Sequence, residues 1–356
     1  MRVAIVLGTR PEIIKLAPLI NKLNKKNSSL IFTGQHYDYE MSIQFFKQLE
    51  VRKPDYSLDV SHSNSASQVS QIIGKLAILF NKIKPDTVMV QGDTNTVLAA
   101  SIAALKCEIP VSHVEAGLRS FDWRMPEEHN RVATDHISEI LFAPTHLSKK
   151  NLISEKVHGK IFVTGNTVID SIDMFADMSA RKAKLEIDER DFALMTLHRA
   201  ENVDNKNILS SIISAVLESN QKTILPLHPR TKKRLLEFGL FEKFAKSKNV
   251  KIIQSIGYFE MLELMKKCSF IMTDSGGIQE EATSPKIHKR LVVIRKSTDR
   301  PEAANAGFSK ITGLSKASIL SAIKQAARNP SLPKKKSPYG TGNASEQIIR
   351  LIHQNI

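Results

Sequence analysis

Short apolar runs alternate along the chain with longer stretches in which apolar residues recur every three or four positions. In the first half the apolar runs are VAIVLG, LIFTG, TVMVQG, VSHVEA, EILFAP and IFVTG. The stretches between them include residues 67–83 and 95–106, both amphipathic. Continuous apolar runs are typical of buried parallel strands, and the longer period is typical of helices. The alternation predicts a parallel sheet with crossover helices, the α/β class.

The second half of the chain repeats this rhythm with the runs FALMTL, TILPL, VKIIQ, SFIMT and LVVIR. A chain of 356 residues is long enough for two cores of ordinary domain size. We therefore expect two doubly wound, Rossmann-like domains, with residues 1–168 in the N-terminal domain and residues 169–342 in the C-terminal domain. Near this boundary, at about residue 180, a short helical stretch gives way to a charged segment without either period.

Polar residues directly follow many of the predicted strands. They are Thr9, Arg10, Gln35, His36, Asp93 and Glu115 in the first half, and His198, His228 and Ser275 in the second. Ligands of open parallel sheets bind at the carboxyl ends of the strands. Two such domains facing each other across a cleft would line it with these residues, which predicts a ligand site.

The net charge of +15 raises the question of a nucleic-acid partner. The basic clusters are small and scattered, with NKKN at residues 24–27, KKR at residues 232–234 and KKK at residues 334–336. The sequence contains no RNA-binding aromatic motif, zinc-finger spacing or basic heptad region. We therefore expect no nucleic-acid partner, and we interpret the charge as a solvated surface whose field attracts anionic substrates.

The chain carries no sign of a membrane, a disulfide or a metal. No stretch approaches the roughly 18 consecutive apolar residues of a transmembrane helix, and the N-terminal residues are wrongly flanked for a signal peptide. We expect a cytoplasmic protein without a membrane partner. Cys107 and Cys268 lie far apart within apolar stretches, which predicts buried free thiols and no metal site.

The segment MTDSGGIQEEA at residues 272–282 predicts an anion site. Apolar residues before it are typical of a strand, so Gly276 and Gly277 fall at the start of the following helix. Unpaired N–H groups and the helix dipole favour an anion there, and glycine lets a phosphate approach closely. Ser275 could cap the helix and donate to the same anion. Taken alone, such a segment is more often an ordinary N-cap with a flexible turn, so other residues must decide.

Charged residues of the first half gather in two segments. In GTRPEIIK, Pro11 predicts a helix start, and Arg10 and Lys15 could direct positive charge at a phosphate. The segments HVEAGLRS and MPEEHNRVATDH contribute Glu115, Arg119, Glu127, Glu128 and Arg131. Glu127 and Arg131 are spaced i, i+4 on a predicted helix and could form only a surface salt bridge. Carboxylates clustered in a cleft would instead have perturbed proton affinities, as acid–base chemistry requires.

Two histidines follow successive predicted strands of the second half. The motifs TLHRAENVD and LHPR contain His198, with Arg199 beside it, and His228. A single histidine in a loop is more often a plain hydrogen-bonding residue. Two of them at neighbouring strand ends favour a functional site.

These motifs together resemble the non-hydrolysing UDP-N-acetylglucosamine 2-epimerases. In chain order they are GTRPEIIKLAPL, TGQH, QGDTNT, HVEAGLRS, PEEHNR, TGNTVID, LHRAEN, LHPR, DSGGIQEEA and DRPEA, and PYGTGNASEQII is similar to that family's C-terminal end. The resemblance implies a fold similar to glycosyltransferase type B, with a last helix at residues 343–356 returning to the N-terminal domain. It also implies a homodimer that interconverts UDP-N-acetylglucosamine and UDP-N-acetylmannosamine without a metal or nicotinamide cofactor.

The resemblance implies roles for the matching residues. In this family UDP is eliminated to leave an enzyme-bound 2-acetamidoglucal, and it is added back after a proton returns to the opposite face of sugar carbon 2. The diphosphate would be held by Arg10, His228, Ser275, Gly276 and Gly277, and the ribose hydroxyls by Glu281. The acid–base residues would be Asp93, Glu115, Glu127 and His198. Supporting contacts would come from Lys15, Gln35, Arg131 and Arg300.

Within the acid–base set we favour Glu115 and Glu127 as the proton-handling pair, with Asp93 orienting the acetamido group or the leaving oxygen. Near the expected uracil position the chain offers Met261 or Tyr258 in place of the family's usual aromatic residue.

Several alternatives stay open at this point. Relatives act on other UDP-2-acetamido sugars, such as diacetamido-uronic acids, and the motifs do not distinguish these substrates. A hydrolysing 2-epimerase would release N-acetylmannosamine and UDP, although GTRPE argues against it. A glycosyltransferase or a non-catalytic binder would use a similar UDP site, and the carboxylates of the first half argue against both.

Overall fold

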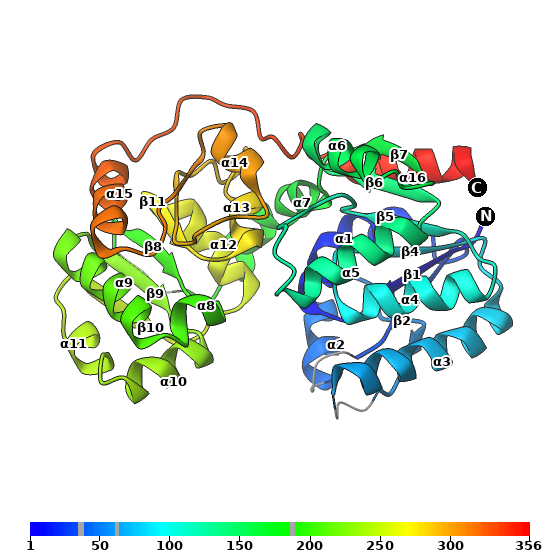
Figure 1. The fold of residues 1–356 in the computed structure, drawn as a ribbon, viewed down its shortest axis with the longest axis horizontal. Helices are drawn as coiled ribbons and strands as arrows, with labels where there is room; N and C mark the ends of the chain where they lie inside the picture. The colour runs from blue at the N-terminus through cyan, green and yellow to red at the C-terminus, as the bar shows by residue number, and fades with distance from the viewer. Residues whose placement is uncertain (35–38, 61–63, 186–188) are drawn as a thin grey trace. The chain divides into compact units, whose positions relative to one another are not determined.

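The computed structural model describes residues 1–34, 39–60, 64–185 and 189–356. The chain divides into two compact units, the first formed by Met1–Ser171 with Tyr339–Ile356 and the second by Ile172–Pro338. Each unit is a parallel sheet flanked by helices (Figure 1). The α/β class with two doubly wound sheets, predicted from the alternation of apolar and amphipathic stretches, is confirmed.

The sheet of the first unit is 7-stranded and parallel, in the order β3-β2-β1-β4-β5-β6-β7. The strand bounds are β1 Val3–Leu7, β2 Ser28–Phe32, β3 Tyr56–Ser57, β4 Thr87–Gln91, β5 Val111–Val114, β6 Ile140–Ala143 and β7 Lys160–Val163. Every residue of β1, β4, β5 and β6 is buried, as expected where helices cover both faces of a parallel sheet. The chain builds outward from β1 on one side and from β4 on the other. The carboxyl ends of β1 and β4 therefore flank a topological switch point.

Helices of the first unit connect these strands. Their bounds are α1 Arg10–Lys22, α2 Tyr39–Gln48, α3 Ser65–Ile83, α4 Asn95–Lys106, α5 Pro126–Ile137, α6 His146–Ser154, α7 Thr167–Lys182, which continues into the second unit, and α16 Ala344–Asn355. Proline lies in the first turn of α1 and of α5, where its missing N–H costs nothing. The C-terminal helix α16 packs against α1, and the N–H groups of Ala344 and Ser345 donate to Asp170 at 3.2 and 2.8 Å.

The sheet of the second unit is 6-stranded and parallel, in the order β10-β9-β8-β11-β12-β13. The strand bounds are β8 Ala193–Thr196, β9 Thr223–Pro226, β10 Val250–Ile253, β11 Phe270–Thr273, β12 Leu291–Val293 and β13 Ser309–Ile311. The helix bounds are α8 Ala200–Val203, α9 Lys206–Ser219, α10 Pro229–Glu237, α11 Phe241–Ala245, α12 Tyr258–Lys267, α13 Gly276–Glu281, α14 Pro301–Asn305 and α15 Lys316–Arg328. Here the switch point lies between β8 and β11.

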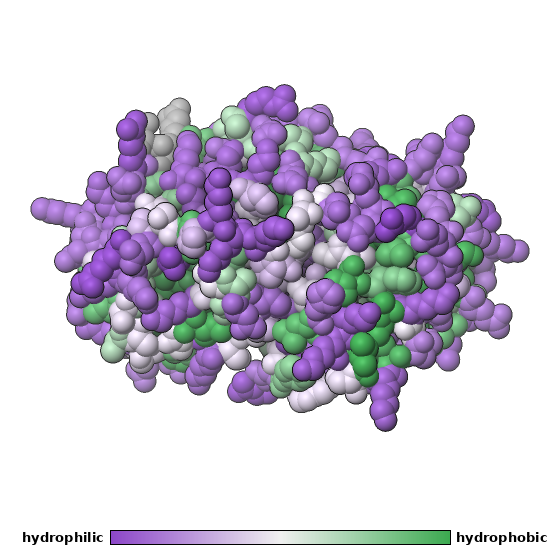
Figure 2. Space-filling model, turned by 90° about the horizontal axis from the view of Figure 1, so that it is seen from above, coloured by the Kyte–Doolittle hydropathy of each residue, from purple (hydrophilic) through white to green (hydrophobic). Residues whose placement is uncertain are grey.

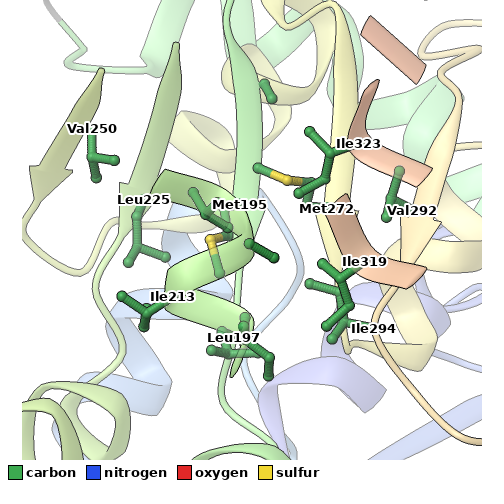
Figure 3. Close-up of a cluster of buried hydrophobic side chains, with 14 of the residues drawn as sticks. Met195, Leu197, Ile213, Leu225, Val250, Met272, Val292, Ile294, Ile319 and Ile323 are labelled. Carbon is green, nitrogen blue, oxygen red and sulfur yellow. The ribbon is translucent and has the colours of Figure 1, made fainter. Parts of the chain in front are cut away.

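The core of the second unit packs one face of its sheet against α9 and α15 (Figure 3). Met195, Leu225 and Met272 come from three neighbouring strands, and Ile213 of α9 and Ile323 of α15 belong to the same buried cluster. Burial of one such side chain contributes about 1.5–3 kcal/mol. This packing fixes the strands and, with them, the polar turns at their carboxyl ends.

Hydrophilic residues predominate on the face of the surface that Figure 2 presents, and apolar residues form small groups there. In the part of the chain that the structure describes, no helix is long and apolar enough to cross a membrane.

The two cysteines are free, as predicted, but they differ in burial. Cys268 is buried, and burial raises the pKa of its thiol to about 12. Cys107 is only half-buried, because it follows the last residue of α4 and caps that helix. The prediction that both thiols are buried is therefore wrong for Cys107.

Candidate active site

The polar turns of the first unit meet at one edge of its sheet. The strands β1, β4 and β5 are neighbours, and they lead into the turns Gly8–Arg10, Gly92–Thr94 and Glu115–Gly117. Parallel strands present their carboxyl ends at the same edge, so these turns lie side by side. The sheet therefore collects candidate residues that are far apart in the sequence.

Glu115 is a buried carboxylate held by two donors. Its Oε2 atom lies 2.6 Å from the Lys15 ammonium and accepts from the Gln91 amide at 2.9 Å. The backbone of Glu115 has a φ of 71°, a left-handed conformation that is uncommon for residues with a side chain and clusters at functional sites. Glu115 and Lys15, both predicted as site residues, thus form one ion pair. Charge-assisted bonds of this length fix the position of the carboxylate.

Arg131 joins Asp93 to the start of α5. Its Nη2 atom lies 2.6 Å from Asp93 Oδ2, and its Nη1 atom donates to Glu128 Oε2 at 2.7 Å. The spacing of Glu127 and Arg131 allowed a surface salt bridge at i, i+4. In the structure Arg131 pairs at i, i+3 with Glu128, which is buried, whereas Glu127 is exposed on the first turn. The helical period of 3.6 residues permits either spacing, so the sequence could not choose between them.

Glu128 was noted in the sequence but not included among the predicted site residues. Its carboxylate accepts from the N–H groups of Ser120 and Phe121 and from the Ser120 hydroxyl, each at 2.9 Å. Burial alone would raise the pKa of Glu128, but these bonds and Arg131 hold it below its usual range. Ionised Glu128 thereby fixes Arg131, which in turn holds Asp93.

Glu12 is a second buried carboxylate that the sequence analysis missed as a site residue. It accepts from the N–H groups of Gly8 at 2.9 Å and Thr9 at 2.6 Å, and from the Thr94 hydroxyl at 2.9 Å. Burial raises its pKa to about 7, although these hydrogen bonds act in the opposite direction. The sequence did carry a signal for this residue. Thr9 is followed three positions later by Glu12, which is the spacing of a capping box. Glu12 ties the turn after β1 to the turn after β4.

Arg10 begins α1 and is exposed, with its guanidinium 5.6 Å from the centre of the Phe45 ring. An exposed cation at a helix start beside the switch point is well placed to meet an anionic ligand. Gln35, also predicted as a site residue, lies outside the described residues.

In the second unit, Asp274 organises the turn after β8. Its Oδ2 atom accepts from the N–H groups of His198 at 3.0 Å and Arg199 at 2.9 Å, and its Oδ1 atom lies 3.1 Å from His198 Nδ1. Burial alone would raise the pKa of Asp274, but His198 and the backbone donors hold it below its usual range. Ionised Asp274 fixes Nδ1 as a protonated nitrogen of His198 and leaves Nε2 for another partner.

His228 lies next to His198, as expected for residues at the ends of the neighbouring strands β9 and β8. The two ring centres are 5.5 Å apart. His228 Nδ1 accepts from the N–H group of Arg230 at 3.2 Å, so Nε2 carries the proton of the neutral ring. Burial and the neighbouring His198 lower the pKa of His228. A neutral ring with its N–H directed elsewhere is a suitable hydrogen-bond donor to an anion.

The predicted anion turn begins α13. Ser275 precedes the helix, and Gly276 and Gly277 are its first residues. A Cβ atom on Gly276 would lie 3.7 Å from Arg199 Nη2 and 3.7 Å from each carboxylate oxygen of Asp299, so a guanidinium and a carboxylate both flank the turn. Burial and the nearby charge of Arg295 lower the pKa of Arg199, which shows that two cations crowd this region. Bare backbone therefore lies at the start of α13 beside the cation of Arg199 and the carboxylate of Asp299.

Two successive carboxylates of α13 have different surroundings, as the helical period predicts. Glu280 is buried and forms an ion pair with Arg300, whose Nη1 atom is also 2.7 Å from Asp299 Oδ2. Glu281 is half-buried, and after burial its charge is the second cause of the raised pKa of Tyr258. Arg300, predicted as a substrate contact, is thus already paired with two carboxylates.

Comparison with known proteins identifies the relatives of this chain. Residues 20–353 match the protein-family model described as UDP-N-acetylglucosamine 2-epimerase. A UDP-N-acetylglucosamine 2-epimerase of Methanocaldococcus jannaschii is 43% identical, and a UDP-2,3-diacetamido-2,3-dideoxy-D-glucuronate 2-epimerase of Pseudomonas aeruginosa is 36% identical, each over 99% of both chains. A crystal structure of the M. jannaschii enzyme in complex with UDP-GlcNAc and UDP matches over 100% of both chains, with a TM-score of 0.88 and 41% identity. The predicted fold is thereby confirmed over the whole chain.

Proposed function

The chain belongs to the UDP-N-acetylglucosamine 2-epimerase family and is therefore an isomerase, and from this premise we propose how its residues invert carbon 2 of the sugar. Its substrate is UDP-N-acetylglucosamine and its product is UDP-N-acetylmannosamine, and the reaction is reversible. The observation that carries this proposal is the match over the whole chain to relatives that bear this name, combined with buried carboxylates at the switch point of the first sheet.

The chemistry explains why both a diphosphate site and carboxylates are needed. Carbon 2 is not next to a carbonyl, so its proton becomes acidic only as the bond from carbon 1 to UDP breaks. A carboxylate takes the carbon 2 proton, the electron pair of that C–H bond forms the C1–C2 double bond, and the C1–O electron pair leaves on UDP. In the second step of the same turnover, a proton is added to the opposite face of carbon 2, and the UDP oxygen attacks carbon 1. The intermediate is 2-acetamidoglucal.

The residues of the second unit bind UDP in this proposal. The diphosphate lies against Ser275, Gly276 and Gly277, and His228 donates to it from Nε2. This assignment is supported by the bare backbone at the start of α13 and by the positive charge of Arg199 beside it. From the resemblance of the motifs we also assign Arg10 to the diphosphate and Arg300 to a supporting contact. Glu281, which is half-buried on α13, accepts from the ribose hydroxyls.

The residues of the first unit, with His198, handle protons. We assign the two proton transfers at carbon 2 to Glu115 and Glu127, and the orientation of the acetamido group or leaving oxygen to Asp93. The support for Glu115 and Asp93 is their place on adjacent turns, each with a fixed cation within 2.6 Å, from Lys15 and Arg131 respectively. Glu127 is exposed at the first turn of α5, and its assignment rests on the resemblance of the sequence motifs. We also assign Gln35 to the substrate contacts.

Incubation of the purified chain with UDP-N-acetylglucosamine in deuterated water tests the reaction. We expect deuterium at carbon 2 of both epimers and no net loss of UDP-sugar. Accumulation of UDP with free N-acetylmannosamine would instead identify a hydrolysing enzyme. Absence of exchange at carbon 2 would contradict the proposed function.

A panel of UDP-sugars tests the substrate assignment. The Pseudomonas aeruginosa relative makes a UDP-2,3-diacetamido uronate the relevant competitor. We expect kcat/KM for UDP-N-acetylglucosamine to exceed that for the diacetamido uronate, and the reverse order would overturn the assignment. Activity should survive extensive chelation, because the proposed mechanism requires no metal or other cofactor.

We further propose that the chain acts in the cytoplasm as a homodimer, without a nucleic-acid or membrane partner. The support is the membership of this family together with the resemblance of the sequence motifs. Light scattering of the purified chain should give the mass of two copies, and the mass of one copy at micromolar concentration would contradict the dimer.

A further inference from the structure

His113 lies fully buried in β5 with both ring nitrogens in hydrogen bonds. Its Nδ1 atom lies 2.7 Å from Asp135 Oδ1, and its Nε2 atom lies 2.9 Å from the carbonyl oxygen of Gly92. A carboxylate and a carbonyl oxygen can only accept hydrogen bonds. Both ring nitrogens must therefore carry a proton, which makes the ring an imidazolium.

Asp135 is the ionised partner of this ring. Its Oδ2 atom lies 2.7 Å from Arg119 Nη2 and accepts from the N–H group of Gly117 at 3.1 Å. Burial alone would raise the pKa of Asp135, but His113 and Arg119 hold it below its usual range. Arg119 Nε in turn donates to Glu155 Oε1 at 2.7 Å. Charges alternate along this chain of contacts, so the imidazolium–carboxylate pair is balanced without solvent.

The imidazolium–carboxylate pair touches two turns that carry acid–base candidates. The imidazolium donates to the carbonyl of Gly92, the residue before Asp93, and Gly92 has a φ of 84°. The carboxylate accepts from the N–H group of Gly117, two residues after Glu115, and Gly117 has a φ of 81°. One buried pair therefore anchors both left-handed turns at the switch point, one through each of its members.

A purely structural role accounts poorly for charge at this position. Apolar residues of similar volume in place of a buried ion pair are often neutral or stabilising. Apolar side chains would fill the space between β5 and α5, but they would leave the carbonyl of Gly92 and the N–H group of Gly117 without these partners. Two directed hydrogen bonds to the turns are what the charged pair supplies in addition.

We propose that His113 and Asp135 are positioning residues that hold Asp93 and Glu115 in the geometry needed for proton transfer at sugar carbon 2. The inference rests on the proposed function, because it concerns the same reaction. A displacement of about 1 Å at reacting groups can cost about 100-fold in rate. The proposed diphosphate turn belongs to the other unit. A substitution that breaks the imidazolium–carboxylate pair should therefore lower kcat and leave UDP affinity unchanged.

Substitutions at His113 separate its two bonds. The side-chain amide of His113→Asn can reach Asp135 but is too short for the carbonyl of Gly92, whereas that of His113→Gln can reach the carbonyl. Asp135→Asn keeps the shape and removes the charge. Ser112→Ala is the control, because it deletes a buried hydroxyl of the same strand that bonds to Thr87 at 3.0 Å and touches neither turn.

Steady-state epimerisation by the full chain gives the first readout. Deuterium exchange at carbon 2 by the wild type is measured first. If the wild type shows no exchange, the proposed function fails, and this inference is not what has been contradicted. We expect kcat to fall about 100-fold in His113→Asn and Asp135→Asn, with UDP affinity within about twofold of the wild type. His113→Gln should retain about tenfold more kcat than His113→Asn, and Ser112→Ala should match the wild type. Wild-type kcat in folded His113→Asn, with only a lower unfolding temperature, would overturn the proposal.

Two-bond proton–nitrogen correlation spectra of the histidine rings give a second readout that needs no turnover. We expect Nε2 of His113 to carry a proton and to show the hydrogen bond to the carbonyl oxygen of Gly92. An unprotonated Nε2 in the wild-type ring would remove the donor to Gly92 on which the proposal depends.

Discussion

Lys15 and Glu115 form an ion pair of 2.6 Å that joins α1 to the turn after β5. Their side chains are 12% and 4% exposed, so both charges are largely shielded from water and each stabilises the other. The pair holds the Glu115 carboxylate at the switch point while its backbone is left-handed. Both residues belong to the proposed site, and their contact gives separate predictions for catalysis and for stability.

Glu115→Gln should abolish most turnover without loss of UDP binding. The amide has nearly the shape of the carboxylate but cannot accept a proton from carbon 2, and removal of a catalytic base typically costs about 10²–10⁴-fold in rate. Proton NMR of the anomeric signals of the two epimers measures kcat, and calorimetry measures UDP affinity. Glu218→Gln, an exposed change on α9, is the control. Turnover close to the wild type in Glu115→Gln would remove Glu115 from the mechanism.

Lys15→Met should destabilise the chain, because it removes the Lys15 cation from the buried Glu115 carboxylate. Loss of one partner from a buried pair costs about 3–5 kcal/mol, whereas loss of both can be nearly neutral. We therefore expect the double variant Lys15→Met, Glu115→Gln to recover most of the loss in urea unfolding. Lys22 lies on α1 like Lys15 and forms an exposed ion pair with Glu346 of α16. Lys22→Met removes this pair and should change stability much less. Equal losses in the single and double variants would contradict an energetic coupling.

Glu12 should make stability depend on pH near neutrality. Its pKa is about 7 in the folded chain against an ordinary value of 4.5, so the folded state binds more protons between these values. The free energy of unfolding then falls as pH rises from about 4.5 to about 7, by at most about 3 kcal/mol.

Glu12→Gln should remove this contribution, although the amide oxygen cannot replace both carboxylate oxygens as acceptors. We expect the stability of the wild type relative to Glu12→Gln to decrease across this pH window and to be constant above it. Urea unfolding of both proteins from about pH 4.5 to about pH 8.5 measures the difference. A difference that does not vary with pH would show that Glu12 keeps an ordinary proton affinity.

The sequence predicted the sheets because their signal is long and periodic. Buried parallel strands such as β1 and β4 are continuous apolar runs, and the topology places the residue after each of them at one edge. The residues at these strand ends, including Asp93 and Glu115, could therefore be selected before any contact was known. The contacts of Lys15 with Glu115 and of Arg131 with Asp93 follow from the strand order, which no local pattern encodes.

The remaining partners lack a local signal or carry an ambiguous one. Glu127 and Glu128 are both within reach of Arg131 on a helix, and burial decided for Glu128. His113 lies within an apolar run and has the sequence signature of an ordinary strand residue. Asp274 precedes the glycine turn and supports His198 from another strand, which only the order of β8 and β11 brings about.

Asp274→Asn should impair the second unit. The amide has one acceptor oxygen and cannot serve His198 Nδ1 together with the N–H groups of His198 and Arg199, so the turn that carries both residues should shift. We expect UDP to bind about tenfold more weakly, a loss of about 1.4 kcal/mol, as measured by calorimetry. Asp204→Asn is the matched control, because this half-buried carboxylate pairs with Arg230 and Arg234 in the same unit. Unchanged UDP affinity in Asp274→Asn would show that the turn tolerates the change.

Gly117→Ala should lower the stability of the chain by more than the cost of placing a side chain on a left-handed backbone. Gly117 has a φ of 81°, and a Cβ atom there would lie 2.3 Å from the carbonyl oxygen of Ser148. Gly239 has a φ of 69°, but a Cβ atom there would meet nothing within 4 Å among the described residues. The conformational cost of a side chain at positive φ is about 1–2 kcal/mol and should appear in both variants.

The clash with Ser148 is confined to Gly117, and relief of such overpacking costs about 1–3 kcal/mol more. Urea unfolding should therefore separate the two alanine variants by at least about 1 kcal/mol, with Gly117→Ala the less stable. Because Gly117 lies two residues from Glu115 and its N–H group bonds to Asp135, the same variant should also lose turnover. Equal stability of the two variants would mean that α6, which carries Ser148, yields without cost, and that the turn is less rigid than its contacts indicate.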